Sequence, residues 1–155
     1  GRTDFGTLAA RALIGALTSQ VGDHLPALFG ADAEDVRIGT ARLSTPRGFS
    51  RAARAYFGKL LGASLSSWLD RTLATHVGPG RRFPDIAGRA AFDEALASYC
   101  AEATLIIGEF SAGWQAATLR RIGTIGTAEA RVYGAVAFKK IGEELRIRRR
   151  DHEDA

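Results

Sequence analysis

Apolar residues recur every three or four positions along most of the chain, a spacing typical of helices with one buried face. The first such stretch covers residues 3–29, and Gly22 and Pro26 are expected to bend or end that helix. Residues 30–44 show no comparable period, although the apolar positions between Val36 and Leu43 suit a short extended segment. We therefore predict one helix followed by a connector in this part of the chain.

The second predicted helix has clear signals at both ends. Ser44 or Thr45 can cap it, because a hydroxyl oxygen accepts a hydrogen bond from an N–H group of the first turn. Pro46 suits the first helical position, where a missing N–H group costs nothing. The apolar stripe continues to about His76, and the glycine-proline-glycine run at residues 78–80 cannot continue a helix. This pattern predicts a long helix.

Two further helices are predicted in the second half of the chain. One covers residues 88–121 and contains the most apolar part of the sequence, and Gly123 suits the position just beyond its end. The other begins at Thr127 as its cap, with Glu129 in the first turn. A carboxylate there interacts favourably with the positive end of the helix dipole. It is expected to fray within residues 146–155.

Together these elements predict an all-α fold, a bundle of about four helices in which two are long and neighbours are antiparallel. The 155 residues suit a single helical domain over residues 1–155. A fragment or a subunit of a larger protein or assembly is the second interpretation of the same sequence.

Glycine occurs repeatedly inside the predicted helices, where each one costs about 1 kcal/mol relative to alanine. Close approach of a neighbouring helix can offset this cost, because glycine has no side chain to hold the neighbour away. We expect the glycines at positions 108, 113, 134 and 142 to let the third and fourth predicted helices approach each other. Gly58 and Gly62 either turn inward or leave a bare strip of backbone, and a bare strip would mark a partner-binding site.

Positive charge is concentrated in the middle of the chain. The net charge is +4, yet residues 46–90 hold eight basic residues and only two acidic ones. Arg47, Arg51 and Arg54 lie three and four positions apart, so they share one helix face, and that face continues through the two glycines. The stripe is either a solvated face or a surface for phosphates or an acidic partner, since arginine matches both kinds of oxyanion.

Residues that catalyse reactions or bind metals do not cluster in the sequence. The single cysteine and the three histidines lack the paired spacing of a zinc site, and no glutamate stands three positions before a histidine as di-iron bundles require. Cys100 lies in an apolar run, so we expect an inert buried thiol rather than a nucleophile activated by His76. We therefore expect no metal, no cofactor and no catalytic residue.

Composition sets the expected surroundings. One cysteine allows no disulfide framework, which favours a reducing compartment such as the cytoplasm. Eighteen arginines against three lysines indicate a genome biased toward GC-rich codons, which we interpret as bacterial. Charged residues interrupt every apolar stretch that approaches the length of a membrane span, so no membrane is expected as a partner.

Two functions remain, ahead of an enzyme. The first is a non-enzymatic module that binds a protein partner or a second copy of itself, with Gly58 and Gly62 at the contact. The alternative is a small basic subunit that binds nucleic acid through phosphate contacts. The residues expected to make those contacts, or to hold another anion, are Arg47, Arg51, Arg54, Arg81, Arg82, Arg120 and Arg121.

Overall fold

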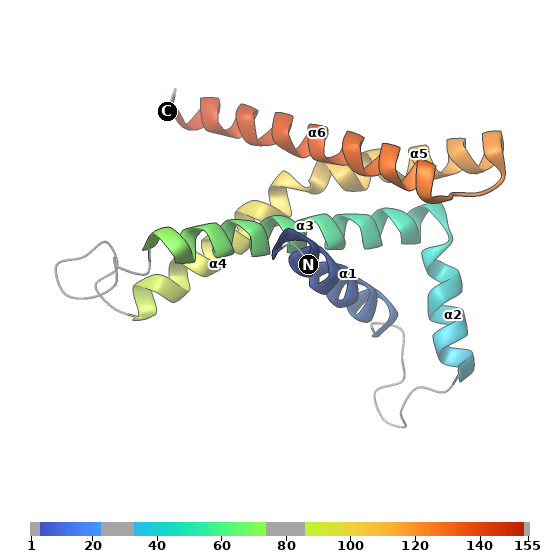
Figure 1. Cartoon of the computed structure of the whole chain (residues 1–155), viewed down its shortest axis with the longest axis horizontal. Helices are drawn as coiled ribbons and strands as arrows, with labels where there is room; N and C mark the ends of the chain where they lie inside the picture. The colour runs from blue at the N-terminus through green and yellow to red at the C-terminus, as the bar shows by residue number, and fades with distance from the viewer. Residues whose placement is uncertain (1–3, 23–32, 74–85, 154–155) are drawn as a thin grey trace.

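The computed structural model describes residues 4–22, 33–73 and 86–153, and every regular element in these ranges is a helix (Figure 1). The helices are α1 (Asp4–Gly22), α2 (Ala33–Leu43), α3 (Pro46–Leu73), α4 (Ile86–Ala103), α5 (Leu105–Ile122) and α6 (Thr127–Glu153). The predicted all-α class is confirmed for this part of the chain. The predicted count of four was wrong, because a connector is helical and one predicted helix is broken in two.

Helix α2 replaces the extended segment predicted between residues 30 and 44. Glu34 and Asp35 lie in its first turn, where carboxylates favour the positive end of a helix. The Nε of Arg37 also donates a hydrogen bond to Glu34 Oε2 at 2.7 Å. Gly39 is buried against Val21 of α1, since a Cβ at Gly39 would lie 3.0 Å from the Val21 Cγ1. The short apolar pattern was therefore helical, and it touches α1 at Gly39 while Val36 and Ile38 stay exposed.

Helix α3 begins as the sequence predicts. The Thr45 hydroxyl oxygen accepts a hydrogen bond from the Gly48 N–H at 3.0 Å, which satisfies a donor of the first turn. A Cβ at Gly48 would lie 1.8 Å from the Arg42 carbonyl oxygen, so the end of α2 crosses the start of α3 at backbone distance. This crossing fixes the sharp corner between the two helices (Figure 1).

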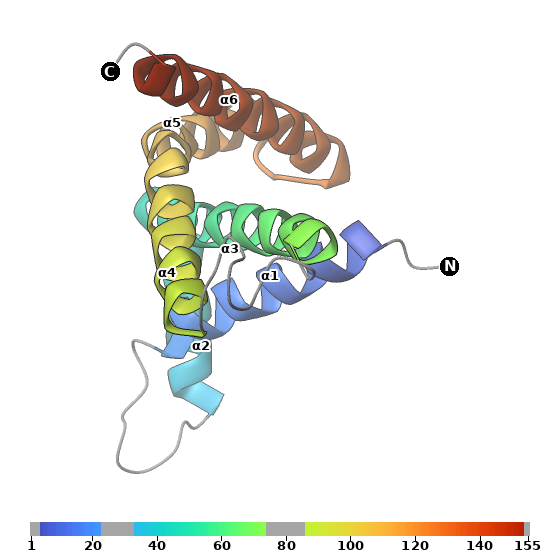
Figure 2. The same cartoon turned by 90° about the vertical axis from the view of Figure 1, so that its left-hand side faces the viewer.

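The predicted helix over residues 88–121 is interrupted at Thr104, which separates α4 from α5. The buried Thr104 hydroxyl donates to the carbonyl oxygens of Cys100 at 2.9 Å and Ala101 at 3.1 Å. The Ile107 N–H bonds to the Thr104 carbonyl, three residues back instead of four, which tightens the backbone here. A hydroxyl that bonds to the preceding turn bends a helix, and α5 leaves α4 in a new direction (Figure 2).

The turn between α5 and α6 follows the sequence prediction closely. Gly123 has the left-handed φ of 83° that glycine allows, and its N–H donates to the Leu119 carbonyl at 2.8 Å. The Glu129 carboxylate accepts a bond from the Gly126 N–H at 2.9 Å, so Gly126 takes the cap position expected for Thr127. Helix α6 ends at Glu153, inside the range over which the sequence predicts fraying.

Helix α3 lies at the centre of the arrangement. Its backbone lies close to α1, α2, α4 and α5. Helix α6 lies close to α5 and α4, and its side chains reach α3 in the core. In both views α3 lies between α1 on one side and the α5–α6 pair on the other (Figures 1 and 2). The predicted bundle therefore has a central helix, and α4 crosses it instead of running beside it.

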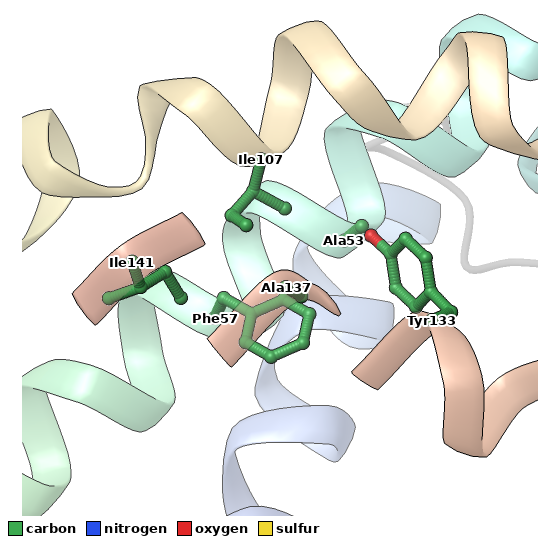
Figure 3. Packing of buried hydrophobic residues seen from close by; sticks show 6 residues of the cluster. All are labelled: Ala53, Phe57, Ile107, Tyr133, Ala137 and Ile141. Carbon is green, nitrogen blue, oxygen red and sulfur yellow. The ribbon is translucent and has the colours of Figure 1, made fainter. Parts of the chain in front are cut away.

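The main core lies where α3, α5 and α6 meet. Its buried side chains are Ala53, Phe57, Ile107, Tyr133, Ala137 and Ile141 (Figure 3). The Tyr133 ring lies 4.6 Å from the Trp114 ring and 5.4 Å from the Phe110 ring, measured between centroids. Its hydroxyl shares a hydrogen bond of 2.7 Å with Ser111. Large aromatic side chains thus fill the space between α5 and α6.

These rings explain why the expected close approach of α5 and α6 was wrong. A Cβ added at Gly113, Gly134 or Gly142 would meet nothing within 4 Å. Only Gly108 faces a neighbour, and that neighbour is α3, because the Ser50 hydroxyl donates to the Gly108 carbonyl. The glycines at close helix contacts are instead Gly39 of α2 and Gly48 and Gly58 of α3.

Candidate partner-binding groove

An open groove of about 530 Å³ lies between α1, α3 and α4. Helix α3 lines it with Arg51, Arg54, Ala55, Gly58, Lys59 and Gly62. Helix α4 adds Ala97, Cys100, Ala101 and Thr104, and α1 adds Gln20. The groove thus contains both glycines that the sequence predicts as a partner-binding strip.

The floor of the groove is made of small residues because two helices meet there at close range. A Cβ at Gly58 would lie 3.3 Å from the Thr104 Oγ1, and a Cβ at Gly62 would lie 4.0 Å from the Cys100 Sγ. Both glycines are half-buried, so neither of the two expected outcomes describes them fully. The strip turns toward α4 and still remains open along the groove.

Three cationic side chains stand on the rim: Arg51, Arg54 and Lys59. All three are exposed, and within the described residues none of them forms an ion pair. Arg89 and Arg148 differ, since each is held by two carboxylates elsewhere on the molecule. The rim charge is therefore not neutralised by neighbouring carboxylates.

Two rim side chains pack their stems against glycines of neighbouring helices. The Lys59 Cδ lies 3.5 Å from where a Cβ of Gly15 would stand, so the stem of this lysine runs along α1. The Arg54 Cδ lies at the same distance from the Cβ position of Gly108 in α5. Each apolar stem thus packs against bare backbone, while the charged head stays in water.

Burial disfavours the reactive thiolate form of Cys100. Its side chain is buried, and burial raises the pKa of the thiol above its ordinary value. No group of three or more potential metal ligands occurs among the described residues, and His76 lies outside them. The described part of the groove therefore presents cationic and apolar groups, with no base to activate a nucleophile.

None of the other described arginines predicted as anion ligands lines the groove. Arg47 is exposed in the first turn of α3, one turn before the rim. Arg120 and Arg121 are exposed in the last turn of α5, which finishes at the end of the molecule where α3 begins (Figure 1). Arg81 and Arg82 lie outside the described residues.

Sequence reasoning missed the contribution of α4 and the role of Lys59. Ala97, Cys100, Ala101 and Thr104 follow the spacing of one helix face, and their small size could have indicated a second close-approach surface. The break at Thr104 brings this face onto the α3 glycines.

No protein-family model, curated protein or solved structure matches the chain. Within the ranges that the structure describes, no helix combines the length and the apolar character needed to cross a bilayer.

Proposed function

We propose that the chain is a non-enzymatic helical module that binds a protein partner through the groove between α1, α3 and α4. The observation that carries this proposal is the combination of a small-residue floor with three cations that lack ion pairs among the described residues. Apolar floors provide contact area, and charged rims select the partner and speed its association. The partner's place in a bacterial, cytoplasmic complex rests on composition alone.

A catalytic role has less support. The titratable side chains among the described lining residues are Arg51, Arg54, Lys59 and Cys100, and burial raises the pKa of the thiol. A general base needs a pKa near the working pH and must reach the proton that it removes. Neither a histidine nor a carboxylate is among these lining residues.

Nucleic-acid binding is the rival function, because Arg51 and Arg54 could contact phosphates. Single strands are usually held by aromatic side chains on which the bases stack, and the described lining contains no aromatic ring. The groove would then offer phosphate contacts alone, while its apolar floor stayed in contact with water. A protein segment uses both the floor and the rim.

The test is a selection of displayed helical peptides on the folded protein. Peptides that bind the wild type are counter-selected on the Gly62→Leu variant, whose added side chain fills the groove. We expect a pool of peptides that bind the wild type and lose binding on this variant. Gly113→Leu is the matched control, because Gly113 is exposed on α5 with nothing within 4 Å of its Cβ position.

Two outcomes would overturn the proposal. A pool that binds both leucine variants equally would place the binding surface elsewhere. If no groove-dependent peptide emerges, and the protein instead retains DNA or RNA at about 50 mM salt through Arg51 and Arg54, nucleic-acid binding replaces the proposal.

A further inference from the structure

We infer that the occupant of the groove is an acidic helix of the partner protein whose contact face consists of small residues. This inference rests on the function proposed above and adds the chemistry of the partner. Three features of the groove carry it: its length, its floor and the placement of its charges.

The length of the groove suits a short helix. Its α3 wall runs from Arg51 to Gly62, which at 1.5 Å per residue is about 16 Å of helix axis. That length corresponds to about three helical turns on the partner. A docked helix satisfies its own backbone hydrogen bonds, whereas an extended segment would need an open sheet edge, and the described residues contain none.

The floor selects for small side chains. Gly58, Gly62, Ala55, Ala97 and Ala101 have no side chain or a single methyl group, so the backbones of α3 and α4 are accessible from the groove. Two helices approach to about 8 Å only when the contact residues are small, and larger side chains keep the axes further apart. Alanine, glycine or serine at positions i and i+4 of the partner would allow the closest contact.

The charges on the rim select for carboxylates. Arg51 and Arg54 stand toward one end of the α3 wall, and Lys59 lies about 7 Å further along the axis, beside α1. Guanidinium groups bind carboxylates with two parallel hydrogen bonds, which fixes the position of the partner helix. Acidic side chains on both edges of the docked helix would neutralise the charge of the rim. Docking would also partly desolvate these ion pairs.

The sequences of the selected peptides test this inference separately from the proposed function. We expect the groove-dependent pool to be richer than the unselected library in aspartate and glutamate, and in alanine, glycine and serine spaced four apart. Binding of the enriched peptides should weaken about tenfold or more in an Arg51→Glu/Arg54→Glu variant, and it should fall with rising salt. The charge-matched control is Arg120→Glu/Arg121→Glu, at the exposed end of α5.

The possible results distinguish the acidic-helix inference from the proposed function. A groove-dependent pool that is neutral or basic, or that carries large apolar residues at the contact positions, overturns the acidic-helix inference and leaves the proposed function standing. A pool that loses affinity equally in both charge variants shows only general attraction to positive charge, which also overturns the inference. The absence of any groove-dependent peptide overturns both claims.

Discussion

At the scale of single residues, Tyr133 has the most connected side chain in the core. Its ring contacts the rings of Phe49, Phe57, Phe110 and Trp114, with centroid distances from 4.6 to 6.2 Å. Such ring pairs contribute about 0.5–1.5 kcal/mol each beyond the burial of their area. The phenol hydroxyl is buried as well, with a hydrogen bond to Ser111. One residue of α6 thereby joins α6 to both α3 and α5.

Because of the buried phenol, the stability of the protein varies with pH in the alkaline range. Burial raises the pKa of Tyr133 above its ordinary value, and the Ser111 hydrogen bond opposes this only in part. Burial also raises the pKa values of Tyr56 and Cys100. Below about pH 7 all three groups are protonated in both states, so their contribution is fully present. As pH rises past the unfolded values, the unfolded chain loses protons first, and the folded state loses stability.

We therefore expect the urea midpoint to fall between about pH 8, where the unfolded thiol begins to lose its proton, and about pH 11. Tyr133→Phe should lower the midpoint slightly at pH 7, because it removes one hydrogen bond worth about 1 kcal/mol. Its midpoint should then fall less steeply than that of the wild type above about pH 10, since one titrating group is gone. Trp fluorescence follows the unfolding. Parallel curves for the two proteins would contradict the assigned role of Tyr133.

At the scale of helices, two glycines of α3 one turn apart should respond differently to the same substitution. Gly62→Ala introduces an ordinary contact of 4.0 Å with Cys100, so the gain in helix propensity, up to about 1 kcal/mol, should stabilise the protein. In Gly58→Ala the new methyl would lie 3.3 Å from the Thr104 Oγ1, which two hydrogen bonds hold in place. We expect this second variant to be destabilised.

The measurement is the free energy of unfolding in urea, with each variant compared to the wild type. A Gly58→Ala variant as stable as Gly62→Ala would show that Thr104 can move. In that case the close approach of α3 and α4 at this point would not depend on glycine.

The helices differ in how far the sequence could predict them, and the differences have physical causes. The start of α3 and the end of α5 follow from local chemistry, namely the Thr45 cap and the left-handed Gly123. Helix α2 was missed because its packing against Val21 is a tertiary contact. The break at Thr104 was missed because a threonine inside an apolar run has no local signal that its hydroxyl will bond backward.

The candidate site likewise has one part that the sequence could predict and one part that depends on tertiary contacts. The sequence alone indicated Gly58 and Gly62 as a candidate contact site. Glycine lowers the helix propensity of this segment, and both glycines continue the helix face that carries the arginines. It could not indicate the opposite wall, since the position of α4 depends on the break at Thr104. The packing of the Lys59 stem against Gly15 of α1 is also a tertiary contact that the sequence does not show.

At the scale of the whole molecule, one helix is apolar on more than its buried face. Helix α1 buries Ala12 and Ala16 against the rest of the protein. On another side it exposes Ala10, Leu13, Ile14 and Leu17, spaced as a second helical stripe, and 65% of Ile14 is accessible to solvent. Helices that are apolar all round are normally buried on all sides. This stripe therefore favours association that is separate from the charged groove.

We expect the wild type to self-associate with rising concentration, as measured by size-exclusion chromatography with light scattering. Leu13→Glu/Leu17→Glu should abolish this association and leave helicity unchanged, because both side chains are already exposed. Ile147→Glu is the control, since Ile147 is exposed between two arginines on α6. The association should be nearly independent of salt, because apolar contacts are not screened. A monomer at every concentration would contradict association through the exposed apolar face of α1. Loss of association at high salt would instead assign the contact to the cationic rim of the groove.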